Sequence, residues 1–200
     1  MLAAKLVFVD VDTQVDFMSP TGKLPVPRAG EIVENLRRLT EYARQRGIPI
    51  IATACAHDEG DAEFQVFPPH CLRGTPGQRR IAETEHAGAA RIGVEPNPQV
   101  VAKLEQTGVV VLEKQVYDVF SNPNAATVFA AVAAAEFVVY GVATDYCVRA
   151  VVLGLREQGR EVIVVSDAIR PVDPRQGAAT IEEFRRQSVR FTSTDELCSR

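Results

Sequence analysis

Short apolar segments rich in β-branched residues recur along the chain and alternate with longer amphipathic stretches. The apolar segments span residues 5–11, 49–54, 109–113, 137–142, 161–166 and 188–191. Such runs are typical of strands that belong to a parallel sheet and are buried on both faces. The alternation therefore predicts an α/β protein built from βα units.

The amphipathic stretches predict four helices. In residues 29–45 the apolar side chains recur at a spacing close to that of one helical face. Residues 122–135 begin with Asn-Pro-Asn and continue with Ala and Val, which predicts a capped helix of small residues packed closely on the sheet. The other predicted helices span residues 147–157 and 176–186.

Residues 55–98 break this alternation. They contain repeated Pro and Gly and all three histidines of the chain, with only weak hydrophobic periodicity. A long irregular segment in a compact domain is usually functional or disordered. Because no internal repeat or linker interrupts the 200 residues, we expect one domain that spans residues 1–200.

Composition and charge narrow the range of partners. The chain is 46% hydrophobic and 24% charged, and its 22 basic and 26 acidic residues give a net charge of −4 without a basic block. This balance argues against nucleic acid and anionic membrane surfaces as partners. It favours small, neutral or weakly charged substrates.

Nothing in the pattern indicates export or insertion into a membrane. The N-terminal apolar run meets Asp10 too soon for a signal peptide, and no segment approaches the roughly 20 apolar residues of a membrane span. The four cysteines, at positions 55, 71, 147 and 198, lack paired spacing. We therefore expect reduced thiols and a cytoplasmic location.

Three separated motifs carry candidate chemistry. The first, DTQVDF at residues 12–17, follows an apolar strand, whose end would present the Asp12 carboxylate to the crevice of an open α/β sheet. An aspartate after a strand is also a common cap or turn residue, so this motif alone does not identify a site.

The second motif, EKQVYDVFSN at residues 113–122, places Lys114 at the end of an apolar run. A lysine at a strand end usually extends its ammonium group into water. The neighbouring Tyr117 and Phe120 instead indicate a walled pocket around it.

The third motif, YGVATDYCV at residues 140–148, leads from a buried strand through Gly141 into a helix whose first turn holds Cys147. The amide groups and the positive end of such a helix lower the pKa of a thiol, favour the thiolate and can hold an oxyanion. The alternative is a buried structural cysteine, which is common for this residue type.

Together the motifs make nearly the whole chain resemble the isochorismatase-like cysteine hydrolases and, within them, the nicotinamidase/pyrazinamidase group. The family patterns D-x-Q-x-D-F, K-x-x-Y-x-x-F and G-V-A-T-D-x-C-V match residues 12–17, 114–120 and 141–148. The resemblance implies a three-layer α/β/α fold of Rossmann-like topology with a six-stranded parallel sheet and an Asp12–Lys114–Cys147 triad. It also implies a non-proline cis bond before Ala143 and an oxyanion hole formed by the amides of Ala143 and Cys147.

In this family the triad hydrolyses a small carboxamide. By resemblance, Cys147 would attack the carbonyl carbon, Asp12 would accept the thiol proton, and Lys114 would hold the charges in place. The products would be an acid and ammonia. We expect the substrate to contact Phe17, Leu24, Phe67, Tyr117, Val142, Ala143 and Tyr146.

The metal motifs of the nicotinamidase group are only partly present. The segment T-x-D-W-H reads TACAH at residues 53–57, so that Cys55 replaces Asp, and W-P-P-H-C reads FPPHC at residues 67–71. The resemblance implies a metal site formed by Cys55, His57, Glu63 and His70. A thiolate ligand would favour Zn²⁺ over Mn²⁺ or Mg²⁺. The alternative is a decayed site whose histidines bond to the backbone.

The leading hypothesis is an amidohydrolase for nicotinamide or a similar small carboxamide, without an organic cofactor and assembled as a homo-oligomer. One rival is another activity of the family, such as cleavage of isochorismate or of another amide or ureido compound. The other is a catalytically silent binding subunit. The histidine pair favours the amidase branch, and an intact triad disfavours a silent subunit. No role is assigned to Cys71, His86 or Cys198.

Overall fold

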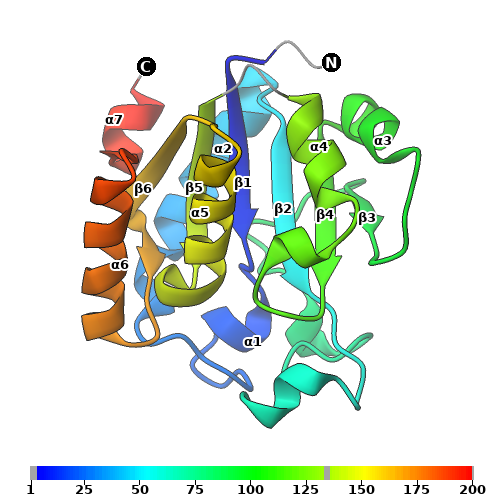
Figure 1. The fold of residues 1–200 in the computed structure, drawn as a ribbon. Helices are drawn as coiled ribbons and strands as arrows, with labels where there is room; N and C mark the ends of the chain where they lie inside the picture. The colour runs from blue at the N-terminus through cyan, green and yellow to red at the C-terminus, as the bar shows by residue number, and fades with distance from the viewer. Residues whose placement is uncertain (1–3, 133–135, 200) are drawn as a thin grey trace.

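The computed structural model describes residues 4–132 and 136–199, and a seven-stranded parallel sheet forms its centre (Figure 1). In the order β3-β4-β2-β1-β5-β6-β7, the central β1 (Leu6–Val11) lies between β2 (Ile50–Cys55) and β5 (Glu136–Val142). The outer strands are β4 (Val109–Lys114) and β3 (Ala90–Ile92) on one side, and β6 (Val162–Arg170) and β7 (Arg190–Thr192) on the other. β2 is buried along its whole length, as both faces of the sheet are covered.

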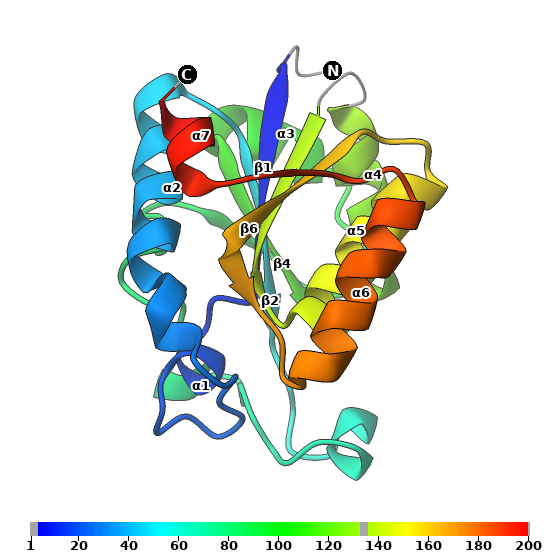
Figure 2. The ribbon, with the colours of Figure 1, turned by 90° about the vertical axis from the view of Figure 1, so that its left-hand side faces the viewer.

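Helices cover the two faces and give a three-layer α/β/α arrangement, with α5 and α6 on one side and α2 and α7 on the other (Figure 2). The first face packs against α3 (Val100–Thr107), α4 (Ala125–Ala131), α5 (Arg149–Glu157) and α6 (Pro174–Arg186). The second packs against α2 (Val33–Arg46) and α7 (Thr194–Cys198). Within residues 4–132 and 136–199, no helix is long and apolar enough to cross a bilayer.

The predicted α/β class, parallel sheet and three layers are confirmed, but the sheet has seven strands where six were expected. The additional strand is β3, which has three residues and lies within the segment expected to be irregular. Only its Ile92 is buried, so it produces no apolar run in the sequence. The patterns also do not predict α3 or the short α1 (Val15–Met18).

The predicted asparagine cap of the helix at residues 122–135 is wrong. The helix α4 begins at Ala125, and its N-cap residue Asn124 makes no side-chain cap bond. The Asn122 amide instead donates to the carbonyl of Glu113 at 2.7 Å, and the Asn124 amide donates to that of Glu95 at 2.8 Å. These side chains fasten the loop beside β4 rather than the helix. Residues 133–135 of the predicted helix lie outside the described residues.

Two other predicted helices begin in a tighter or wider turn. A 3₁₀ turn, Ala29–Ile32, precedes α2, and a π-helical turn, Thr144–Val148, precedes α5. The second turn follows β5 at the carboxyl edge of the sheet. The loops after the strands, with α1 and the 3₁₀ turns Ala62–Gln65, Pro76–Gln78 and Val119–Ser121, gather at this edge, at the bottom of Figure 1. Open α/β sheets form their sites there.

Candidate active site

Three side chains from separate strand ends meet at the carboxyl edge of the sheet. Asp12 follows β1, Lys114 ends β4, and Cys147 lies in the π-helical turn after β5. The ammonium Nζ of Lys114 lies 2.8 Å from Asp12 Oδ2 and 3.6 Å from Cys147 Sγ, and all three side chains are buried. The structure thus brings together the three residues, here called the triad, that the separated motifs predicted.

Both carboxylate oxygens of Asp12 are engaged. Thr53 on β2 donates its hydroxyl to Asp12 Oδ1 at 2.6 Å, while Oδ2 faces the Lys114 ammonium. The backbone of Asp12 is left-handed, with φ of 48°, and its N–H donates to the Thr53 carbonyl at 3.3 Å. Sequence reasoning assigned no role to Thr53, although it is the first residue of the segment compared with T-x-D-W-H and the one hydroxyl in an otherwise apolar strand.

Burial and the neighbouring charges act in opposite directions on the pKa values of Lys114 and Cys147. Burial lowers the pKa of Lys114, but the nearby Asp12 carboxylate and the two cysteine sulfurs reverse this and raise its pKa well above the usual value. Burial raises the pKa of Cys147 well above its usual value, because the attraction of Lys114 is the weaker effect and Asp12 adds to the rise. The resting nucleophile is therefore a thiol beside a lysine ammonium, and the thiolate expected from its helical position is wrong.

A close approach of two strands positions the turn that holds Cys147. Gly141 has φ of +115°, and a Cβ atom there would lie 2.1 Å from the carbonyl oxygen of Val11. Only glycine permits β5 to pass β1 at this distance. One residue further along, the peptide bond between Val142 and Ala143 is cis, as the resemblance implied.

Two other polar residues of the first motif, Gln14 and Asp16, connect the turn after β1 to the end of β2 and to residues 56–98, here called the long loop. Gln14 accepts from the Cys55 N–H at 2.7 Å and donates to the Cys55 carbonyl at 2.8 Å. Asp16 accepts from the N–H groups of Cys71 at 2.7 Å and Lys23 at 3.0 Å. The motif therefore supports the loop as well as the triad.

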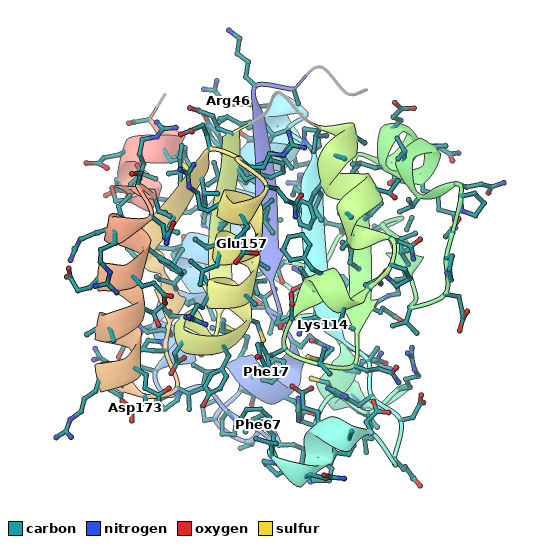
Figure 3. All side chains as sticks on the ribbon, viewed as in Figure 1. Phe17, Arg46, Phe67, Lys114, Glu157 and Asp173 are labelled. Atoms are coloured by element: carbon teal, nitrogen blue, oxygen red, sulfur yellow. The ribbon has the colours of Figure 1, made fainter. Side chains whose placement is uncertain are left out.

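An apolar cavity of about 110 Å³ opens onto Cys147. It is lined by Phe17, Leu24, Val26, Cys55, Glu63, Phe67, His70, Tyr117, Val142, Ala143, Tyr146, Cys147 and Val172. The ring of Tyr146 contacts those of Phe67 and Tyr117 edge to face, with centroids 5.4 and 6.4 Å away. In Figure 3, Phe17 and Phe67 lie with Lys114 at this end of the sheet, opposite Arg46.

All seven residues predicted to contact substrate line the cavity, and two further residues, Val26 and Val172, complete it. Val172 follows β6 and is held by Asp145, whose carboxylate accepts from the N–H groups of Val172 and Asp173, both at 2.9 Å. Neither valine has a signal in the sequence, because its place depends on the path of a loop.

The predicted metal ligands also converge. Cys55, His57 and His70 each offer a ligand atom, and these atoms lie within 4.8 Å of one another. We call these three residues the donor cluster. The fourth predicted ligand, Glu63, places Oε2 3.2 Å from His57 Nε2, and within the described residues neither atom has a hydrogen-bond partner.

The orientation of both imidazole rings suits metal binding. His57 Nδ1 lies 2.9 Å from Asp61 Oδ2, and His70 Nδ1 lies 2.8 Å from the Pro68 carbonyl, so Nε2 of each ring is available as a ligand. Burial lowers the pKa of both histidines, which keeps the rings neutral. The Asp61 contact has no counterpart in the decayed-site alternative, whose histidines bond only to backbone.

Cys55 connects the donor cluster to the triad. Its Sγ accepts from Lys114 Nζ at 3.1 Å, closer than the Cys147 sulfur. Burial raises the pKa of Cys55 to about 12, although Lys114 opposes the rise. The same ammonium group therefore contacts the candidate nucleophile and a candidate metal ligand.

Known proteins share this arrangement of elements. A model of the isochorismatase domain matches residues 6–196. The nicotinamidase of Escherichia coli (strain K12) is 27% identical over 190 residues, which cover 82% of each chain. The pyrazinamidase of Pyrococcus horikoshii, in complex with zinc, superposes with a TM-score of 0.76 at 24% identity, covering 94% of this chain and 99% of that one. N-carbamoylsarcosine amidase from Thermoplasma acidophilum gives 0.75 at 25% identity, covering 96% and 97%. The chain belongs to the isochorismatase domain family.

Proposed function

We propose that the protein is an amidohydrolase that converts nicotinamide or a similar small carboxamide to the acid and ammonia. The observation that carries this proposal is the Lys114 ammonium, paired with the Asp12 carboxylate at 2.8 Å and 3.6 Å from a cysteine sulfur that faces an apolar cavity. The similarity to a nicotinamidase and a pyrazinamidase supports it.

In the first half of the reaction, Cys147 Sγ attacks the carbonyl carbon and its proton moves to Asp12. The raised pKa of the thiol makes this transfer necessary, and Lys114 stabilises the sulfur as its negative charge develops. The amides of Ala143 and Cys147 would hold the oxyanion. Asp12 then passes the proton to the leaving nitrogen, ammonia departs, and a thioester to Cys147 remains.

In the second half, Asp12 takes a proton from water, and the resulting hydroxide attacks the thioester carbonyl. The carboxylic acid leaves and the proton returns to Cys147. The carboxylate serves twice because Thr53 and Lys114 hold its two oxygens throughout. Lys114 carries its charge in the resting site, because the Asp12 carboxylate helps to raise its pKa well above the usual value against the effect of burial.

The cavity favours a neutral substrate over an anionic one. Among the described residues that line it, none is Lys or Arg, and Glu63 contributes a carboxyl group. Isochorismate or an N-carbamoyl amino acid would bring a carboxylate into this space without a counterion. Aromatic rings of Phe67 and Tyr146 instead suit a flat, uncharged ring.

We include in the proposal a divalent metal ion, most consistent with Zn²⁺, held by Cys55, His57 and His70, with Glu63 as a further ligand. The converging ligand atoms support this, as do His57 Nε2 and Glu63 Oε2, which lie 3.2 Å apart and make no hydrogen bond within the described residues. When bound, the ion supplies a Lewis-acid contact for a ring nitrogen or other donor atom of the substrate. The residues of the chain provide the nucleophile and both proton transfers.

The decisive experiment compares ammonia release from nicotinamide, pyrazinamide and an aliphatic amide with turnover of isochorismate. We expect an aromatic carboxamide to be the best substrate and Cys147→Ala to lose at least about 10³-fold in kcat. Cys198→Ala, the same change at a cysteine near the C-terminus, is the matched control and should retain activity. Turnover by Cys147→Ala, or conversion of isochorismate without that of any amide, would reject the proposal.

A further inference from the structure

A buried ion pair lies behind the triad and outside the cavity. Asp10 is on β1, and Arg80 follows the 3₁₀ turn Pro76–Gln78. Their side chains are 0% and 1% exposed, and Asp10 Oδ2 is in direct contact with Arg80 Nη2. Neither residue is among the described residues that line the cavity. Because buried ion pairs are often no more stabilising than apolar side chains, stability alone explains this pair poorly.

Other polar atoms of the pair contact Thr13, which follows Asp12 in the chain, and Thr53, which bonds Asp12 from β2, while Arg80 Nε donates to the Thr84 carbonyl at 3.3 Å. The Thr13 hydroxyl donates to Asp10 Oδ1 at 3.0 Å and accepts from Arg80 Nη2 at 2.8 Å. Arg80 Nη1 donates to the Thr53 carbonyl at 3.4 Å. That carbonyl also accepts from the Asp12 N–H, and the Thr53 hydroxyl bonds the Asp12 carboxylate. The ion pair therefore contacts Asp12 indirectly, through its neighbour Thr13 and through Thr53, which bonds both the backbone and the carboxylate of Asp12.

Backbone bonds reinforce the same connection. The N–H of Val15 donates to the Arg79 carbonyl at 2.8 Å, and the N–H of Ile81 donates to the Thr13 carbonyl at 3.0 Å. Arg80 lies between these two bonds, so its guanidinium is directed at the turn that follows β1. The segment around Arg80 thus pairs with this turn both through backbone and through side chains.

Asp12 requires such support because its backbone is unfavourable for a residue with a side chain. Its φ of 48° lies in the left-handed region, which persists in non-glycine residues when the surroundings hold it. Its carboxylate must also remain aligned with Lys114 and Cys147. A displacement of about 1 Å at a reacting group can cost roughly 100-fold in rate.

We propose that the Asp10–Arg80 ion pair is a positioning device that holds the Asp12 carboxylate in register with Lys114 and Cys147. It acts through Thr13 and Thr53 and does not touch substrate. The proposal rests on the proposed function for the role of Asp12. It assigns to Asp10 and Arg80 an effect on kcat with little effect on KM.

The test uses the double variant Asp10→Asn/Arg80→Met, which leaves no unpaired buried charge. We measure kcat and KM for the amide turned over by the wild-type protein, the urea midpoint of unfolding, and the rate at which iodoacetamide alkylates Cys147. The alkylation rate, followed by mass spectrometry of the Cys147 peptide, needs no substrate. A matched control, Arg37→Met/Glu41→Gln, removes an ion pair from the exposed face of α2.

We expect the double variant to lose about 10-fold or more in kcat and in alkylation rate, with KM within about twofold and with the control unchanged. Arg80→Lys should recover part of the loss, because it retains the charge but not the second contact. Unchanged kcat and alkylation in a folded double variant would overturn the proposal. If that variant does not fold, Thr13→Val, which removes one hydroxyl and no charge, decides by the same criteria. If the wild type hydrolyses no amide, the proposed function fails and the alkylation rate alone judges the ion pair.

Discussion

The triad and the donor cluster lie side by side but depend on different kinds of structure. Asp12, Lys114 and Cys147 lie at or just beyond the ends of strands whose backbones are paired, with Val11 opposite Gly141 and Cys55 opposite Lys114. In the donor cluster only Cys55 lies on a strand, while His57 and His70 lie in the long loop, oriented by Asp61 and Pro68. The sheet fixes the triad, whereas the ring of each histidine is oriented by one contact of its Nδ1 within the loop. Substitutions in the triad should therefore change stability and activity more than substitutions in the donor cluster.

The largest effect is expected for Lys114→Met. It leaves the Asp12 carboxylate buried without its cation, so the free energy of unfolding should fall by about 3–5 kcal/mol, as for other broken buried pairs. Activity should fall by about 10³-fold, because the sulfur loses its only nearby cation in the triad. Urea unfolding and ammonia release measure the two effects, with Lys5→Met at an exposed position as control. A variant that is as stable and as active as the wild type would show that the Lys114 ammonium is needed neither for the fold nor for the reaction.

Cys55→Asp tests the boundary between the two regions. Replacing the thiolate ligand of a bound metal by a carboxylate should lower the affinity for Zn²⁺ about 10- to 100-fold. It should also reduce the ratio of the Zn²⁺ affinity to the Mn²⁺ affinity. Competition with a chromophoric chelator measures both affinities, and Cys198→Asp is the matched control. Unchanged Zn²⁺ affinity would show that Cys55 is not a metal ligand and contacts only Lys114 of the triad. Less than about one-tenth equivalent of bound metal in wild-type protein never exposed to chelator would remove the metal from the proposal.

Asp145→Ala tests a loop contact that faces the cavity. The carboxylate accepts two N–H groups that hold Val172 at the cavity wall. Losing them should raise KM about 10-fold and leave kcat within about twofold, since each bond contributes about 1 kcal/mol and no triad residue moves. Steady-state kinetics measure the split. Ser193→Ala, which removes the N-cap of α7 on the opposite edge, should change stability but not KM. An equal fall in kcat would mean that this loop also aligns the triad.

The smallest effect concerns His86, which lies in the long loop. Burial lowers the pKa of His86 to about 4, from an ordinary value of 6.5. Between these values the unfolded chain binds the proton and the folded chain does not, so the free energy of unfolding falls as pH falls from 6.5 to 4. Allowing for partial exposure, the loss is about 1 kcal/mol. His86→Gln should lack this decline when urea midpoints are compared at pH 7 and pH 4.5. If the variant shows the same pH dependence as the wild type, His86 is not its cause.

The fold could be predicted because it rests on local sequence. Every central strand is a short apolar run, and parallel strands end at one edge, which places Asp12 and Lys114 at the same edge of the sheet. The family resemblance joined these two residues with Cys147 in a triad. The family resemblance supplied the metal ligands, whose convergence the spacing alone did not require. The homo-oligomeric assembly and the cytoplasmic location stay predictions.

The features that were missed depend on contacts between distant residues. Asp10 and Arg80 pair across a loop whose path no periodicity encodes, and either residue alone would read as a surface charge. The thiolate expected at Cys147 was wrong because the helix start is buried, and the loss of hydration outweighs the attraction of the lysine. The cap expected before α4 was wrong because the Asn124 side-chain oxygen, which could accept from a helix N–H, accepts from the Asn97 N–H of a loop instead, at 2.7 Å.

The central place of β1 has a consequence for synthesis of the protein on the ribosome. β1 emerges first, yet one of its edges pairs with β5, which begins at Glu136. A nascent chain that ends before β5 presents the apolar edge of Leu6–Val11 without a partner, and such edges invite association with other chains. The strand that closes this edge also delivers Cys147. Cys147 therefore joins Asp12 and Lys114 only at the stage of translation at which this edge of β1 is covered.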